Sequence, residues 1–185
     1  NLDIIPSNIH IANLERHLIT EVNGNYKLKD IIEDNSLKEK YQMIFIDTPP
    51  SLGMLTVNAL VATDLVVIPV RCAKYSVSGL QDLMETIKQT SKHMNPGLEI
   101  LGAFINQYDP RRRIVTGIEK DIVSFFNDSL FKTRVRFNTR IEEAALKRKP
   151  IFLYDKNSIG AQDFTSLCDE IFARIESRND RKAPG

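Results

Sequence analysis

The residues best suited to chemistry surround one carboxylate in the first third of the chain. Residues 43–46 read Met-Ile-Phe-Ile, a short apolar run that predicts a buried strand, and Asp47 follows directly. An Asp at the carboxyl end of a parallel strand lies where open α/β sheets bind ligands, and there it can orient Mg²⁺ beside phosphates. Asp47 could instead cap the next turn. Pro49 and Pro50 fix their own φ and donate no backbone hydrogen bond, so they predict a stiff loop.

The sequence around Asp47 is similar to that of a known family. Residues 45–53 read Phe-Ile-Asp-Thr-Pro-Pro-Ser-Leu-Gly, and with residues 55–60 they resemble the ParA-type partition ATPases, relatives of MinD with a deviant P-loop. The resemblance begins near Leu2 and extends to about Ile175, so it covers nearly the whole chain in order. Its later parts are residues 66–70, 78–80 and 131–133, Asn138 with Arg140, and residues 149–151, 154–155 and 160–161.

The resemblance implies that ATP and Mg²⁺ are the cofactors and that the activity is ATP hydrolysis. Asp47 is then a catalytic residue that orients Mg²⁺, through a water molecule. Pro49 and Pro50 belong to the second switch, which registers the γ-phosphate. The alternative for the two prolines is a rigid turn with no switching role.

Two asparagines are candidates for contact with the adenine base. An asparagine side chain offers both an acceptor and donors to a base edge. In the family, the positions of Asn106 and Asn138 approach adenine. Asn106 could instead cap a turn. The family usually shows Pro-Arg-Asn, with the Asn at the second position, whereas here Arg136 replaces the proline, and Arg136 is not a convincing base contact.

The basic residues are unevenly distributed. The net charge is +1, but residues 110–150 hold eleven Lys or Arg and five Asp or Glu, a balance of +6 that leaves −5 elsewhere. Such asymmetry suits a phosphate backbone. In the family, arginines at the positions of Arg111 and Arg140 contribute to ATP-dependent, nonspecific DNA binding, and Arg112 and Arg113 join them here. A solvated surface is the alternative, and it is about equally favoured for residues 147–149.

A phosphate loop needs glycines followed by Lys and then Ser or Thr. None of the eight glycines here is followed by Lys. We therefore expect that the family's N-terminal strand and P-loop are missing from this chain, which would alone bind ATP poorly and be inactive as an ATPase.

Composition indicates an ordinary globular protein, with 42% apolar and 26% charged residues. We expect residues 1–176 to be the C-terminal two thirds of a single nucleotide-binding domain, and residues 177–185 a polar tail. Cys72 and Cys168 are far apart, so we expect reduced thiols and a cytoplasmic protein. No Cys/His spacing suggests a metal site.

The apolar patterns alternate between strands and helices, which predicts an α/β fold with a mostly parallel sheet flanked by helices. We expect strands at residues 2–5, 43–46, 65–70 and 98–105 and around Val135. We expect helices at residues 9–22, 26–40, 52–62, 80–87, 114–127 and 141–146, and a last one through Ile159 and Ile175.

Three functions remain open. The first is a bacterial plasmid or chromosome partition ATPase that dimerises with ATP, binds DNA nonspecifically at the nucleoid, and responds to a centromere-binding ParB-like partner. The second is a MinD-like positioning ATPase, but residues 176–185 have no apolar face for lipid. The third is a degenerate binding module without enzymatic activity.

Overall fold

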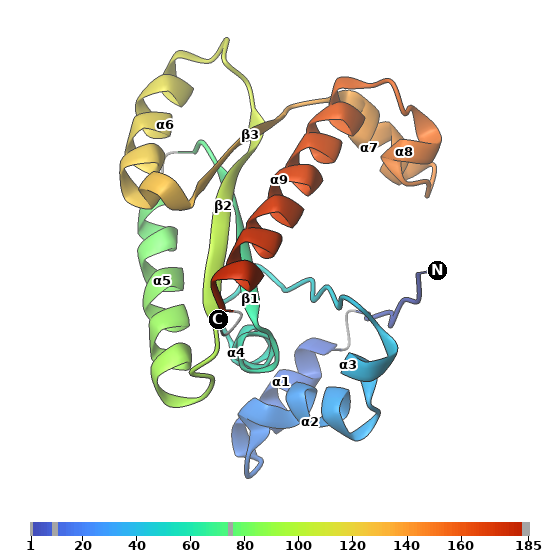
Figure 1. Cartoon of the computed structure of the whole chain (residues 1–185), viewed down its shortest axis with the longest axis vertical. Coiled ribbons are helices and arrows are strands. Elements are labelled where there is room, and N and C mark those ends of the chain that lie inside the picture. The colour runs from blue at the N-terminus through green and yellow to red at the C-terminus, as the bar shows by residue number, and fades with distance from the viewer. Residues whose placement is uncertain (1, 9–10, 74–75, 183–185) are drawn as a thin grey trace. The chain divides into compact units, whose positions relative to one another are not determined.

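The computed structural model describes residues 2–8, 11–73 and 76–182, without the side chains of residues 12, 76–78, 113–114 and 182. The chain forms two compact units. The first comprises Asn1–Leu65 and Asp82–Glu99, and the second comprises Val66–Gln81 and Ile100–Gly185. Figure 1 shows the elements along the chain.

The second unit is organised around a parallel three-stranded sheet. Its strands are β1 (Leu65–Arg71), β2 (Glu99–Tyr108) and β3 (Leu130–Arg136), in the spatial order β1-β2-β3. Register pairs join Ala103 to Leu130, Ile105 to Arg134 and Tyr108 to Arg136, with shifts between them. The carboxyl ends of β2 and β3 therefore lie side by side.

Helices cover the sheet of the second unit. Figure 1 shows the sheet between α6 (Arg113–Phe126) and α9 (Ile159–Lys182). A core cluster of Phe104, Phe131, Val135 and Leu167 joins α9 to β2 and β3. Two short helices, α7 (Thr139–Leu146) and α8 (Ile151–Tyr154), connect β3 to α9, and a 3-10 turn, η2 (Asn127–Ser129), precedes β3.

The first unit is helical. Its elements are α1 (Ile11–Thr20), η1 (Gly24–Tyr26), α2 (Lys27–Asp34), α3 (Leu37–Lys40), α4 (Met54–Ala62) and the later part of α5 (Ser76–His93). Buried Asn58 joins α4 to η1 and α2. Its Nδ2 donates to the carbonyls of Gly24 and Met54 at 2.8 and 3.0 Å, and its Oδ1 accepts the Leu28 N–H at 3.2 Å. A Cβ at Gly24 would clash with the Leu18 carbonyl, so only glycine fits there.

Most of the expected elements are confirmed. The α/β class, the parallel sheet, β1, β2, β3 and the helices near residues 9–22, 52–62, 80–87, 114–127 and 141–146 are present. The expected helix at residues 26–40 is divided between η1, α2 and α3, because Ser36 adopts φ 50°, in the left-handed region. The helix α9 continues to Lys182 and so includes part of the segment that we expected as a tail.

Two expected strands are wrong. Residues 2–5 and 43–46 are not strands, although both are apolar. A strand needs hydrogen bonds from a neighbouring strand, and no described strand pairs with either segment. Apart from half-buried Ile46, their side chains are exposed instead, with Ile5 at 85% and Phe45 at 81%. Apolar character alone therefore mispredicted these segments.

Candidate nucleotide edge and basic surface

The candidate Mg²⁺ ligand, Asp47, lies in the first unit on an exposed segment without regular structure. Pro49 and Pro50 are also exposed. The end of this loop is fixed at the start of α4, where the Thr56 hydroxyl donates to the Ser51 carbonyl at 2.5 Å and the Val57 N–H donates to the Gly53 carbonyl at 3.1 Å. The carboxyl group of Asp47 makes no hydrogen bond or ion pair with another described residue, so its oxygens are open to a ligand.

The structure brings the two candidate adenine residues to one edge of the second unit. Asn106 lies near the carboxyl end of β2, and Asn138 follows β3 and begins α7. The Phe137 N–H donates to the Tyr108 carbonyl at 3.0 Å, so a backbone hydrogen bond joins the two segments that carry the asparagines. The carboxyl edge of a parallel sheet is where such folds bind ligands.

Each asparagine uses its side-chain oxygen locally. Asn106 Oδ1 accepts the Gln107 N–H at 2.9 Å, and Asn138 Oδ1 accepts the Arg140 N–H at 2.8 Å as the N-cap of α7. Because an N–H needs an acceptor, these bonds also fix which end of each amide is nitrogen. Neither Nδ2 group donates to another described residue, so both remain available to a base.

Tyr108 secures the end of β2 through its side chain. Its hydroxyl donates to Glu119 of α6 at 3.0 Å, and the same carboxylate accepts Arg134 Nε of β3 at 3.0 Å. The hydrogen bond to Glu119, followed by burial, raises the pKa of Tyr108. This network fixes the end of β2, which carries Asn106, and the turn between β2 and α6, which carries Arg111.

The arginines of that turn differ in the ion pairs that they form. Arg111 is 84% exposed, yet its Nε and Nη2 donate to the two carboxylate oxygens of Asp109 at 2.9 and 3.2 Å. The hydrogen bond to Arg111 holds the pKa of Asp109 below its usual value. Arg112 is exposed and makes no ion pair with another described residue. The side chain of Arg113 lies outside the described residues.

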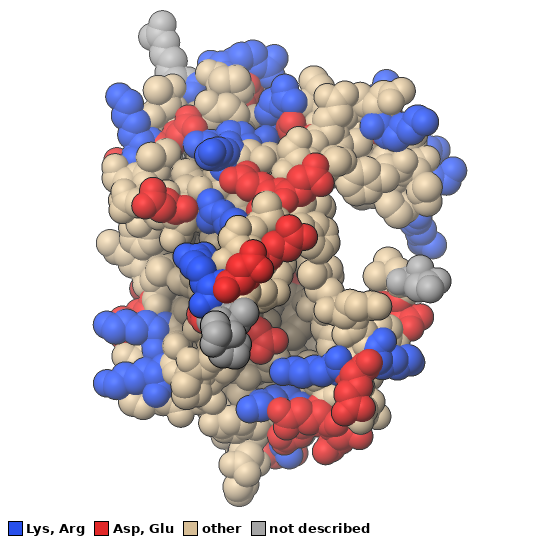
Figure 2. Space-filling view, viewed as in Figure 1, with Lys and Arg blue, Asp and Glu red and all other residues tan. Residues whose placement is uncertain are grey.

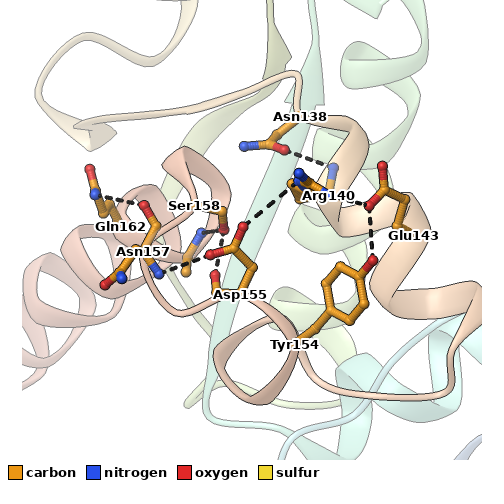
Figure 3. Close-up of polar contacts among 9 residues, drawn as sticks. Asn138, Arg140, Glu143, Tyr154, Asp155, Asn157, Ser158 and Gln162 are labelled. Atoms are coloured by element: carbon orange, nitrogen blue, oxygen red, sulfur yellow. Dashed lines mark hydrogen bonds and ion pairs between the residues drawn. The ribbon is translucent and has the colours of Figure 1, made fainter.

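Arg140 is the centre of a polar cluster on α7 and α8, which Figure 3 shows. Its Nη1 donates to Glu143 Oε2 at 2.7 Å, and its Nε lies 3.8 Å from Asp155 Oδ2. The Tyr154 hydroxyl donates to the same Glu143 oxygen at 2.9 Å. We call Arg140, Glu143, Tyr154 and Asp155 the Arg140 cluster.

The residue that replaces the usual proline, Arg136, is paired with α9. Its guanidinium donates to both carboxylate oxygens of Asp163, and its backbone N–H donates to the same carboxylate. Burial raises the pKa of Asp163, but the bonds from Arg136 outweigh it and the pKa is lowered overall. This agrees with the expectation that Arg136 is not a base contact.

No sequence pattern pointed to Glu119 or Glu143 as a functional residue, and only the family resemblance pointed to Tyr154 and Asp155. Glu143 lies three residues after Arg140, a spacing that places two side chains on one face of a helix, and this signal was available. Glu119 is 15 residues from Arg134 and 11 from Tyr108. No local pattern indicates those contacts.

Among the described residues, no group of three or more His, Cys, Asp or Glu side chains could hold a metal ion. Mg²⁺ is commonly held by one or two carboxylates together with phosphate oxygens and water, and the open carboxylate of Asp47 fits that role. Within residues 2–8, 11–73 and 76–182, no helix has the length and hydrophobicity of a membrane span.

The fold and this edge define the class as a nucleotide-binding α/β protein. A family model described as an AAA domain matches residues 1–100. The sporulation initiation inhibitor protein Soj of Bacillus subtilis is 39% identical over 173 residues, which are 94% of this chain and 68% of the relative. The chromosome partitioning protein ParA of Caulobacter vibrioides is 34% identical over 182 residues, which are 98% of this chain and 68% of the relative.

Solved structures agree with these relatives. Cobyrinic acid a,c-diamide synthase from Mycobacterium smegmatis, with bound ADP and magnesium, is 25% identical with a TM-score of 0.74. That match covers 93% of this chain and 62% of the synthase chain, so the chain spans less than two thirds of that structure. The cell division ATPase MinD of Pyrococcus furiosus has the same fold, with a TM-score of 0.65 and a match that covers 80% of this chain and 58% of that one.

The chain belongs to the ParA/MinD family of ATPases, and its relatives named Soj and ParA place it among the partition proteins of that family. ATP and Mg²⁺ are the cofactors of this family, in keeping with the ADP or ATP analogue and magnesium in solved relatives. The expected family, fold class and cofactors are therefore confirmed.

Proposed function

We propose that the protein acts in plasmid or chromosome partition as an ATPase that dimerises with ATP and then binds DNA without sequence preference. One observation carries this proposal. At the carboxyl edge of the sheet, Asn106 lies near the end of β2 and Asn138 follows β3, and neither Nδ2 donates to another described residue. Each asparagine is followed by exposed arginines, Arg111 and Arg112 in one case and Arg140 in the other.

The asparagines would donate to the base, and the arginines would contact DNA phosphates. Guanidinium groups suit phosphates because their planar donors match two oxygens at once. Such contacts position a protein on DNA without reading sequence, and they weaken as salt rises. Figure 2 shows basic side chains in the region of α7 and α8. Residues 147–149, which lie between these two helices, are exposed.

Asp47 would hold Mg²⁺ through water, with Pro49 and Pro50 in the loop that responds to the γ-phosphate. The metal would neutralise charge on the phosphates. Residues 1–185 contain no glycine followed by Lys, and we propose that by themselves they bind ATP weakly and do not hydrolyse it. The proposed partners are a second copy, DNA and a centromere-binding ParB-like protein, in the cytoplasm at the nucleoid.

The first test is calorimetric titration of Mg-ATP into this 185-residue chain and into a longer version that carries a phosphate loop. Binding confined to the longer version supports the proposal, whereas binding to neither refutes it and favours a degenerate module. In the longer version, D47N should lower Mg-ATP affinity or hydrolysis about 10- to 100-fold, as for residues that act on a metal through water. The control D34N removes an exposed carboxylate of α2 and should change neither.

A further inference from the structure

Arg140 lies where a helix disfavours a positive charge. It is in the first turn of α7, just after the N-cap Asn138, and its side chain is 54% exposed. The N-terminus of a helix carries a positive partial charge, so a cation there is stabilised only when anions lie close to it. In this structure Glu143 and Asp155 supply that negative charge.

The two carboxylates are themselves held in place. Glu143 Oε2 accepts both Arg140 and the Tyr154 hydroxyl, which fixes the carboxylate toward α8 (Figure 3). Asp155 Oδ1 accepts the Asn157 N–H at 3.2 Å, and the Asp155 carbonyl accepts the Ser158 hydroxyl at 2.7 Å. Arg140 can therefore leave these partners, whereas they cannot follow it without breaking further bonds.

We propose that Glu143, assisted by Asp155, competes with DNA phosphate for the guanidinium of Arg140, and so limits DNA binding at this position. The inference rests on the proposed function, in which Arg140 contacts DNA. A bidentate phosphate contact needs two parallel N–H donors. Nη1 donates to Glu143 and Nε faces Asp155, and the guanidinium also interacts with the Tyr154 hydroxyl.

A phosphate makes the full two-point contact with the guanidinium only when Nη1 leaves Glu143. Arg140, and then Tyr154, hold the pKa of Glu143 below its usual value, so the competing carboxylate is ionised at neutral pH. Tyr154 is the positioning residue for that carboxylate. The Arg140 cluster thus limits which phosphates Arg140 binds, because a phosphate that interacts weakly or lies far away does not displace Glu143.

The test compares two neutralising variants on one helix. E143Q removes the competing charge but keeps a side chain of the same shape, and E142Q removes the charge of the adjacent residue, which is exposed and bonds to no other described side chain. Binding of a labelled random-sequence duplex is measured by fluorescence anisotropy in the natural protein that carries these residues, with Mg-ATP. E143Q should raise affinity about two- to fivefold above E142Q, the range of one exposed ion pair.

R140A, alone and combined with E143Q, separates this inference from the proposed function. R140A should weaken binding about two- to tenfold, and E143Q should bring no gain over E142Q in the R140A background. Equal affinities of E143Q and E142Q, with R140A weakened, would overturn the competition and leave the DNA function standing. Unchanged binding by R140A would overturn both the DNA contact and the competition.

Discussion

Arg136 of β3 and Asp163 of α9 form a bidentate ion pair. Arg136 Nη2 lies 2.6 Å from Asp163 Oδ1, and Arg136 Nε lies 2.9 Å from Asp163 Oδ2. The Arg136 N–H also donates to Oδ2 at 2.9 Å. Asp163 is only 7% exposed. One carboxylate therefore satisfies both a side chain and an N–H of the edge strand, and attaches α9 to the end of β3 from which Asn138 follows.

The variant D163N should lower the free energy of unfolding by about 2 kcal/mol at neutral pH, because charge-assisted bonds become neutral ones. The pKa of Asp163 is lowered from its usual 3.8 in the folded state. Its contribution is therefore present above the unfolded pKa and is lost as pH falls through the folded pKa. Urea unfolding at neutral pH and below the usual pKa should show the difference between D163N and wild type shrinking in acid. The control D169N changes an exposed carboxylate of the same helix, and an equal loss there would contradict this account.

In the first unit, N58A should lower the free energy of unfolding by about 3 kcal/mol, since it removes three hydrogen bonds from a side chain that is 4% exposed. The Leu28 N–H and the Gly24 carbonyl would lose their partner. Chemical denaturation followed by circular dichroism measures the change. N35A is the control, because Asn35 is exposed and bonds only to Ile31 one turn away. A cost for N58A no larger than that for N35A would show that α4 and η1 are not joined through Asn58.

The guanidinium of Arg174 attaches α9 to the sheet region through hydrogen bonds to three backbone carbonyls. Its Nη1 donates to the carbonyls of Leu101 and Ser129 at 3.1 and 3.0 Å, and its Nη2 donates to Leu130 at 2.7 Å. The guanidinium also lies 4.0 Å from the ring centroid of Phe131. R174K keeps the charge but not the guanidinium, and should cost about 1–2 kcal/mol of unfolding free energy. R181K, at an exposed position on the same helix, should cost almost nothing, and comparable costs would count against this role.

The two arginines of the β2–α6 turn should differ in how they contribute to DNA binding. R112A should reduce the slope of log affinity against log salt by about 1, as for one lost phosphate contact. R111A should reduce it less, because Asp109 already pairs with Arg111. Anisotropy titrations over a range of salt concentrations measure both slopes. K88A, which removes a side chain of α5 that is 73% exposed, is the control and should leave the slope unchanged. Equal slopes for R112A and wild type would remove Arg112 from the proposed surface.

The two thiols should react at different rates. Burial, followed by repulsion from Glu119, raises the pKa of Cys72, which is 8% exposed, whereas Cys168 is exposed. Alkylation proceeds through the thiolate, so an alkylating reagent should label Cys168 first, and Cys72 should need higher pH or unfolding. Mass spectrometry of the labelled peptides, with C168S as the control, tests the order. Rapid labelling of Cys72 in the folded protein at neutral pH would contradict its buried position.

Sequence patterns predicted the fold wherever one element carries its own signal. The apolar stripes of α5 and α6 and the apolar runs of β1 and β2 lie within a few residues of one another, so local spacing reveals them. Residues 43–46 carry the same kind of run, yet they are exposed and unpaired among the described residues. A strand forms only when a neighbouring strand supplies its backbone hydrogen bonds, and an apolar run in the sequence does not specify that neighbouring strand.

The sequence by itself determined the family, through the string around Asp47, and the candidates Asn106, Asn138, Arg111 and Arg140, because residue types at fixed spacings limit the chemistry they can do. The tertiary structure alone decided what each of these side chains touches. Arg136 pairs with Asp163, 27 residues away, and Arg140 of α7 faces Asp155, which follows α8. Such contacts depend on how the helices pack on the sheet. This packing, and not the order of the residues in the chain, sets the distance between two charged side chains.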